Sequence, residues 1–244
     1  MEDRRTLLAT LEDAPLLVEA RGLLRRDGTL LVPSRERAAA GFVIAPEHDL
    51  AAGYGRPEPG LSDAVRAAAV AGGVEPGALR FRAAPQVLDE WGAARAPAAA
   101  HREVRVLVHD SGRARLEALA ERHGTAPLGE DDPLVEDLPA RLRRELRALG
   151  TWPRATVALA GGSPVAVAHA FVETEGFWDV SVETDAPFRR EGFGAAAVAA
   201  LTLDRLDEDR VAVWAAAASN RASLALARKL GFEDAGRWVE WGPA

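Results

Sequence analysis

The strongest chemical signal in this 244-residue chain is a loop of glycines and arginines, Arg189-Arg190-Glu191-Gly192-Phe193-Gly194. An apolar stretch with strand-like alternation precedes the loop, and an alanine-rich stretch with helical composition follows it. Glycines allow a backbone to approach a ligand closely, and free N–H groups at a helix N-terminus attract anions. The arginines add charged donors. The loop therefore predicts a site for a pyrophosphate, and a helix start with two solvated arginines is the alternative.

One ligand class for this loop is a dinucleotide, because residues 192–197 fit the pattern GxGxxA. Three features oppose it. Residues 185–191 form a long connection where the dinucleotide turn is tight, and the next predicted strand, 211–218, ends in alanines instead of an acid for a ribose. The chain beyond the loop is also too short for a doubly wound sheet. A dinucleotide-binding oxidoreductase is therefore the third-ranked interpretation.

A second motif lies one helix and one strand downstream, with Asn220-x-x-Ser223 followed by Lys229-Leu230-Gly231-Phe232. Together with Arg189-x-x-Gly192-x-Gly194, it resembles the two signatures of the GCN5-related N-acetyltransferase (GNAT) superfamily. Glu183-Thr184, Trp214 and Ser223 are similar to its FR47-like branch. The resemblance covers about residues 103–244. It implies transfer of an acetyl group from acetyl-CoA, as cosubstrate, to an amine.

The resemblance also implies where acetyl-CoA binds. The predicted strands 178–184 and 211–218 would start adjacent and then splay, so that main-chain groups at 182–184 pair with pantetheine like an added strand. The pyrophosphate would lie on the loop amides, Asn220 would orient the pantetheine arm or the loop, and Ser223 would face the cofactor. The predicted cofactor-binding residues are Val182, Glu183, Thr184, Arg189, Arg190, Glu191, Gly192, Phe193, Gly194, Ala195, Asn220 and Ser223.

Acyl transfer to an amine needs a base, a donor for the oxyanion and an acid for the thiolate. The candidate bases are Glu183, Asp179, Glu173 and Glu175, and each also fits a solvated strand carboxylate. His169 is a weaker candidate. Many family members carry a tyrosine acid just after the position of Leu226, where this chain has Ala227. The only tyrosine is Tyr54, so the acid is left open between water, Ser223 and Tyr54.

These motifs need a mixed α/β fold to position them. From residue 103 onward the predicted order is strand, two helices, antiparallel strands, then helix, strand, helix and one or two edge strands. The predicted strands are 104–108, 156–160, 165–172, 178–184, 211–218 and 232–241. The predicted helices are 111–123, with Ser111 as N-cap, 137–149, 195–206 and 220–230, with Asn220 as N-cap and Gly231 as stop.

Residues 1–100 are predicted to be a separate α/β region, joined through an alanine-rich linker at 93–100 to the GNAT-like domain at 103–244. This region would contain helices at 6–24 and 61–71 and strands at 30–33, 41–45 and 79–83. We expect it to be a degenerate half of the same fold. A free-standing partner or sensor domain is the alternative.

Composition narrows the function classes. The chain has no cysteine, one lysine and a net charge of -7. Thiolate metal sites, disulfides and a Walker A loop are excluded, and general nucleic-acid binding is not expected. The five histidines show no metal spacing, so we expect no metal.

No apolar run reaches the roughly 20 residues of a membrane span, and we expect a cytoplasmic protein without membrane binding. The tryptophan-rich strand 232–241 would either pair across a homodimer or be buried within one chain. The function from a different class that fits the same loop is a non-catalytic acyl-CoA-binding sensor module.

Overall fold

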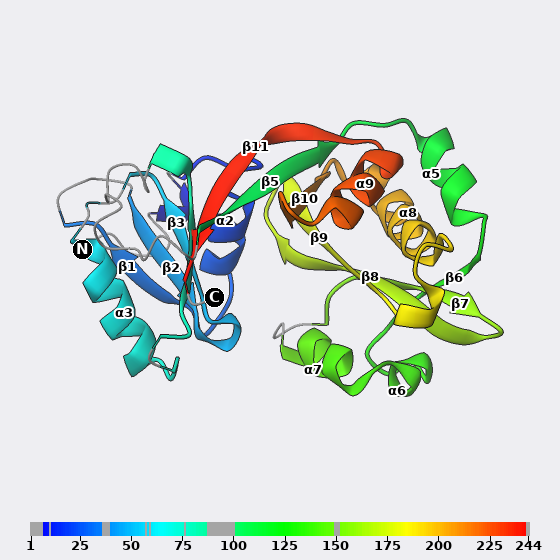
Figure 1. Cartoon of the computed structure of the whole chain (residues 1–244), viewed down its shortest axis with the longest axis horizontal. Coiled ribbons are helices and arrows are strands. Elements are labelled where there is room, and N and C mark those ends of the chain that lie inside the picture. Colours follow the sequence, from blue (N-terminus) through cyan, green and yellow to red (C-terminus); the bar gives the residue numbers. More distant parts are fainter. Residues whose placement is uncertain are drawn as a thin grey trace. The chain divides into compact units, whose positions relative to one another are not determined.

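The computed structural model of the chain describes residues 7–9, 11–35, 40–56, 58, 60–75, 77–86, 101–148 and 152–242. The chain divides into two compact units (Figure 1). Unit 1 comprises residues 1–106, 216–219 and 235–244, and unit 2 comprises residues 107–215 and 220–234. The last part of the final strand is thus counted with unit 1, whereas the predicted domain 103–244 includes it.

Unit 2 contains a mixed sheet in which five neighbouring strands have the order β10-β9-β8-β7-β6. Their bounds are β6 (Gly124–Pro127), β7 (Ala155–Ala160), β8 (Ser163–Glu173), β9 (Phe177–Thr184) and β10 (Val211–Ala217). Successive strands from β6 to β9 are antiparallel, and β10 runs parallel to β9. A parallel pair needs a crossover, which α8 (Phe193–Arg205) provides. This confirms the predicted mixed α/β fold.

Helices cover both faces of this sheet (Figure 1). On one face lies α8, which is buried along most of its length because it also contacts α5 (Arg113–Ala120) and α9 (Arg221–Leu230). The opposite face is covered by α6 (Leu134–Asp137) and α7 (Ala140–Ala148), whose leucines pack on Val157 and Val167. Burial on both faces explains why the central strands are rich in valine and alanine on both sides.

Unit 1 has its own core, built around a second group of strands. Its elements are α2 (Val18–Leu24), β1 (Leu30–Pro33), β2 (Gly41–Ala45), β3 (Leu50–Tyr54), α3 (Leu61–Ala71), β4 (Arg80–Ala83) and parts of β5 (His101–His109), β10 and β11 (Phe232–Trp241). Three aromatic rings centre the core. Phe81 stacks on Trp241 at 5.4 Å between ring centroids and meets Phe42 edge-on at 5.6 Å.

The two units repeat one pattern of connections. In unit 1, β1, β2 and β3 are successively antiparallel, and α3 then leads to β4, which is parallel to β3. In unit 2, β7, β8 and β9 are successively antiparallel, and α8 then leads to β10, which is parallel to β9. Duplication of one fold would give two units with the same order and direction of strands.

Several predicted elements differ from the structure. The helix predicted at 6–24 is wrong as one element: residues 12–14 are not helical and α2 begins only at Val18, because Pro15 has no N–H for a helix interior. Ser111 does not cap α5, since Gly112 holds that position and the Ser111 hydroxyl donates to the Leu230 carbonyl. The linker predicted at 93–100 lies outside the described residues.

The final strand is not an edge strand, contrary to the prediction. β11 is antiparallel to β4 and has β5 on its other side in the strand order. Trp238 and Trp241 are both buried within the chain. The end of the strand, Val239–Trp241, is therefore not available to pair across a homodimer.

Candidate functional site

Strands β9 and β10 separate after a short overlap. Val211, Ala212 and Val213 pair with Phe177, Trp178 and Asp179, and the register ends there, although every residue of both strands is described. On its other side β9 stays paired with β8 as far as Thr184, which lies opposite Ala166. The predicted splay is confirmed. The edge of β9 from Val180 to Thr184 is left uncovered by β10.

A cavity of about 740 Å³ is formed around the end of β9, the loop that follows it, the first turn of α8 and one face of α9. It is lined by Val182, Glu183, Thr184, Phe188, Arg189, Arg190, Gly192, Phe193, Gly194, Ala195, Asn220, Ala222, Ser223, Leu226 and Lys229. Every predicted cofactor-binding residue except Glu191 is in this set. The structure thus brings together residues that lie up to 41 positions apart in the sequence, from Val182 to Ser223.

Four lining residues were missed by sequence reasoning: Phe188, Ala222, Leu226 and Lys229. The last three are spaced at i, i+4 and i+7, which places them on one face of α9. Helical periodicity from Ser223 would have found Leu226, at i+3, but neither Ala222 nor Lys229. Phe188 lies in the short 3-10 turn Ala186–Phe188, which no repeating pattern marks.

The loop has an unusual backbone. Arg190 and Gly192 both have positive φ, at 69° and 104°. For a non-glycine residue this conformation costs about 1–2 kcal/mol and is concentrated at functional sites. Gly194 is needed for a different reason: a Cβ there would lie 2.7 Å from Thr184 Oγ1. The first turn of α8 therefore packs directly against β9, which brings the helix N-terminus to the strand edge.

The charges that line the cavity are mostly positive. Arg189, Arg190 and Lys229 are its cations, and Glu183 is the one acid in the lining. Arg189 also ties the loop to the strand, because its Nε donates to the Thr184 carbonyl at 3.0 Å. The chain has a net charge of -7, which repels anions overall. The positive charges in the cavity create a local potential that favours an anionic ligand there.

Helix α9 presents two polar groups at its N-terminal end. Asn220 caps the helix, as predicted, by accepting a hydrogen bond from Ser223 N at 3.2 Å. The indole Nε1 of buried Trp214 donates to Ser223 Oγ at 3.0 Å. An indole only donates, so Ser223 accepts this bond and keeps its own O–H for another acceptor. Ser223 lines the cavity, which makes that hydroxyl a candidate donor to a bound ligand.

The candidate bases lie in different surroundings. Glu183 lines the cavity. Asp179 lies four residues earlier on β9, on the same strand face by alternation, but it is buried and outside the lining. His169 is likewise buried and outside the lining, on β8 opposite Ser181.

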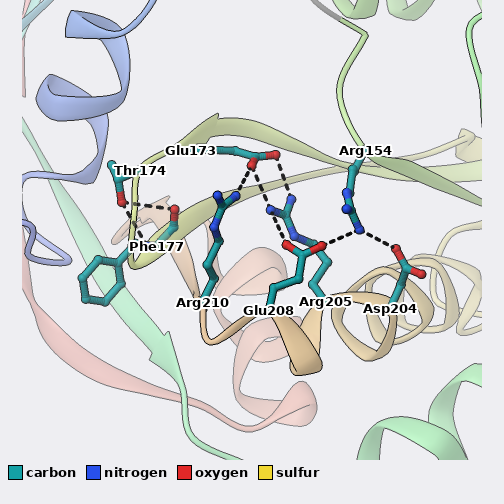
Figure 2. A network of polar contacts seen from close by, with 8 residues as sticks. All are labelled: Arg154, Glu173, Thr174, Phe177, Asp204, Arg205, Glu208 and Arg210. Atoms are coloured by element: carbon teal, nitrogen blue, oxygen red, sulfur yellow. Dashed lines mark hydrogen bonds and ion pairs between the residues drawn. The ribbon is translucent and has the colours of Figure 1, made fainter.

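Glu173 belongs to an ion-pair network at the other end of the strands (Figure 2). The two terminal nitrogens of Arg205 each donate to one oxygen of the Glu173 carboxylate, at 2.9 Å. A terminal nitrogen of Arg210 donates to Glu173 Oε2 at 2.7 Å. The Arg205 side chain is 1% exposed, and its guanidinium carbon lies 4.6 Å from the centroid of the Trp178 ring. Burial alone would raise the pKa of Glu173, but the hydrogen bonds and charge of Arg205, with Arg210 and Arg154, lower it below the ordinary value. A carboxylate held in this way is a poor base, and its contacts indicate a structural role.

Among the described residues, no group of three or more His, Asp or Glu side chains could hold a metal ion. None of the helices that the structure describes is long and apolar enough to cross a bilayer.

Comparisons with known proteins agree with the motifs. Residues 155–240 match the family model of GNAT acetyltransferases, which confirms the resemblance over that segment. The match is to the family as a whole, and the FR47-like branch stays a prediction. No curated protein is significantly similar to the chain in sequence.

Solved structures extend the similarity to nearly the whole chain. A GCN5-related N-acetyltransferase-like protein from Streptococcus suis 89/1591 is 16% identical with a TM-score of 0.68, over 98% of this chain and 93% of that one. A GCN5-related N-acetyltransferase from Kribbella flavida is 18% identical with a TM-score of 0.53, over 96% of each chain. A tandem GNAT protein from the clavulanic acid biosynthesis pathway is 19% identical with a TM-score of 0.54, over 96% of this chain and 90% of that one. At these identities the likeness shows the fold.

Proposed function

Because residues 155–240 match the GNAT acetyltransferase family, we propose that the chain is an N-acetyltransferase that moves an acetyl group from acetyl-CoA to an amine. The observation that carries this proposal is the cavity beside the uncovered edge of β9. It combines an open strand edge, a glycine-rich helix N-terminus and three cations in one place. Use of acetyl-CoA fits a cytoplasmic location.

The parts of acetyl-CoA match the parts of the cavity in order. Pantetheine has two amide groups, which would pair with the main chain of β9 from Val180 to Thr184 as an added strand. The pyrophosphate would lie on the amides at the start of α8, with Arg189 and Arg190 beside it. Lys229, on α9, is the remaining cation for a phosphate group.

The chemistry would proceed by attack of the amine nitrogen on the thioester carbonyl. A new C–N bond forms, the C–S bond breaks, the amine loses a proton and the thiolate gains one. We assign the base to Glu183, directly or through water, because it is the acid in the cavity lining. A main-chain N–H of β9 near Val182 would stabilise the oxyanion. The Ser223 hydroxyl, oriented by Trp214, would pass a proton to the thiolate and regain one from water.

Two earlier candidates are given lesser roles in this scheme. Asp179 is buried outside the lining and would act on the amine only through another group. Tyr54 is buried on β3 in unit 1 and is not among the residues that line the cavity. The Ser223 assignment therefore fills the place of the family's tyrosine.

A non-catalytic acyl-CoA sensor is the second candidate, and one observation favours it. The position of the family's tyrosine is held by Ala227, which is fully buried and presents no polar group. If Ser223 and water cannot supply the proton, the cavity would bind acetyl-CoA without turning it over.

The deciding experiment titrates the protein with acetyl-CoA calorimetrically and follows free thiol with a panel of amines. We expect binding, and thiol release that depends on one class of amine. Glu183→Gln should lower kcat about 100-fold or more with little effect on the affinity for acetyl-CoA. Glu233→Gln, which changes an exposed acid outside the cavity, is the matched control. Binding without thiol release across the panel would favour the sensor, and absence of binding would refute both candidates.

For the N-terminal region we propose a degenerate half of the same fold, within residues 1–100. The repeated pattern of β1-β2-β3-α3-β4 and β7-β8-β9-α8-β10 supports this proposal. The similarity to a tandem GNAT protein over 96% of the chain agrees with it.

A further inference from the structure

His123 contacts the glycine-rich loop from outside the set of residues that line the cavity. It follows α5 in the chain, 68 residues before its partner Glu191. Its Nε2 lies 3.1 Å from the Glu191 carbonyl oxygen. A carbonyl only accepts, so Nε2 must carry the hydrogen in this contact.

The imidazole is also stacked on the helix start. Its ring centroid lies 3.9 Å from that of Phe193, with the ring planes 29° apart. Phe193 in turn meets Phe188 edge-on at 5.7 Å. Three rings, His123, Phe193 and Phe188, thus clamp the two ends of the loop, Phe188 before it and Phe193 after it.

The hydrogen bond fixes the direction of one peptide group. In a trans peptide the C=O and the following N–H point in opposite directions, and no cis peptide bond occurs among the described residues. Because the Glu191 carbonyl points at His123, the Gly192 N–H points away from it. Gly192 lines the cavity and His123 does not, so an N–H that points away from His123 can reach a ligand in the cavity.

The same ring limits what can replace Gly192. A Cβ at Gly192 would lie 3.2 Å from His123 Nε2 and 3.8 Å from its Cδ2, in addition to the strain of a φ of 104°. The imidazole therefore occupies the space behind the loop and prevents the Glu191–Gly192 peptide from turning over.

We propose that His123 is a positioning residue for the pyrophosphate of CoA: it holds the Glu191–Gly192 peptide so that the Gly192 amide can donate to the ligand. The proposal rests on the proposed function, since it needs a CoA-type ligand in the cavity. A change at His123 should therefore alter the affinity for CoA, which has a pyrophosphate. It should not alter the affinity for pantetheine, which has none.

The test separates the hydrogen bond from the stacking. His123→Phe keeps an aromatic ring against Phe193 and removes the donor, whereas His123→Gln keeps an N–H donor and removes the ring. The matched control is His109→Phe, which removes another half-buried imidazole of unit 2 that hydrogen-bonds Ser111 and contacts Phe232 outside the cavity. For each protein, the dissociation constants of CoA and pantetheine are measured by calorimetry and by ligand-observed NMR.

We expect His123→Phe to weaken CoA binding by about three- to tenfold, the range for one hydrogen bond, while pantetheine binding is unchanged. His123→Gln should recover most of the CoA affinity, and His109→Phe should leave the ratio of the two constants unaltered. In ¹⁵N-labelled wild-type protein, the Gly192 amide resonance should move on CoA addition, and it should move less in His123→Phe.

Two results would overturn the proposal in distinguishable ways. If the wild type binds CoA and His123→Phe weakens CoA and pantetheine equally, or neither, the inference fails while the proposed function stands. If the wild type does not bind CoA, the proposed function and this inference fail together.

Discussion

The two units reach their crossover helices through loops that differ in charged residues and in backbone N–H donors. In unit 2 the loop from β9 to α8 carries Arg189 and Arg190 and lines a cavity. In unit 1 the connection from β3 to α3, residues 55–60, contains two prolines, which have no N–H to offer an anion. It also carries Glu58, whose buried carboxylate accepts hydrogen bonds from Ser34 Oγ and from Arg35 N.

The order of strands and helices is shared by the two units, whereas the residues of the loops differ. Both units place a helix N-terminus after a strand, so both have the backbone frame for binding an anion. Both loops contain glycine and arginine, but the loop of unit 2 has two adjacent arginines and lines the cavity. The loop of unit 1 has a single arginine, Arg56, together with two prolines and the buried Glu58. A ligand site is thus a property of local residues added to a shared frame.

The largest expected effect concerns the stability of unit 1. Arg82 lies 2.5 Å from Glu19 and 2.6 Å from Glu240, and both carboxylates are almost fully buried. Burial raises the pKa of Glu19, while the charge of Arg82 acts in the opposite direction. Arg82→Met should reduce the free energy of unfolding by about 3–5 kcal/mol, as for other broken buried pairs. Chemical denaturation would measure this, and a loss under about 1 kcal/mol would refute the assignment.

The second prediction compares the glycines that cap the two crossover helices. Gly192 has a φ of 104° and faces His123, whereas Gly60 has a φ of -70° and open space where a Cβ would be. Gly192→Val should raise the dissociation constant of CoA by about 100-fold, equivalent to about 3 kcal/mol of distortion. Gly60→Val should leave it unchanged. Equal effects of the two substitutions on calorimetric CoA binding would remove the distinction between the loops.

A third prediction addresses Glu173, whose network belongs to unit 2 but not to its cavity. Glu173→Gln should destabilise the protein by about 2 kcal/mol at pH 7, less than a fully buried pair because the carboxylate is one-third exposed. The folded pKa lies below the ordinary value of 4.5, so the stabilisation is present above about pH 5 and is lost as the pH falls through the folded pKa. Thermal melts of both proteins from pH 7 to pH 3 should therefore converge at low pH. A constant difference would contradict this account.

The smallest effect is expected at the one lysine of the chain. Lys229→Met should weaken CoA binding by about three- to tenfold and make it less sensitive to salt, because one exposed cation near a phosphate contributes about 1 kcal/mol. Its neighbour Arg228 pairs with Asp234 and lies outside the cavity lining, so Arg228→Met is the matched control. A comparable loss in both variants would indicate general electrostatic attraction, not contact.

Sequence patterns predicted some elements well and failed on others for physical reasons. Strands β1 and β2 and helix α3 have the bounds that their apolar runs and flanking glycines and prolines indicate. Strands β3 and β6 were not predicted, because Leu50–Tyr54 and Gly124–Pro127 are poor in β-branched residues and are made strands by pairing with neighbours.

The same limit applies to the candidate site. Short motifs found the loop and the cap of α9, since those groups act through local backbone geometry. They could not rank Glu173, Asp179 and Glu183, which lie within eleven residues of one another. What separates Glu173 from the others is Arg205 and Arg210, 32 and 37 positions away. Partners so distant in sequence are set by tertiary packing alone.

The short overlap of β9 and β10 also divides one strand into two regimes of hydrogen exchange. In the overlap, Val211–Val213 pair with Phe177–Asp179, so each strand covers the edge of the other. Amides there should exchange with solvent only when the sheet opens on a large scale. Amides on the open edge beyond Asp179 should exchange through local fluctuations. A ligand that lies along this edge would pair with β9 and protect its amides. The slowing of amide exchange on β9 and the affinity of the ligand would then both report the same binding equilibrium.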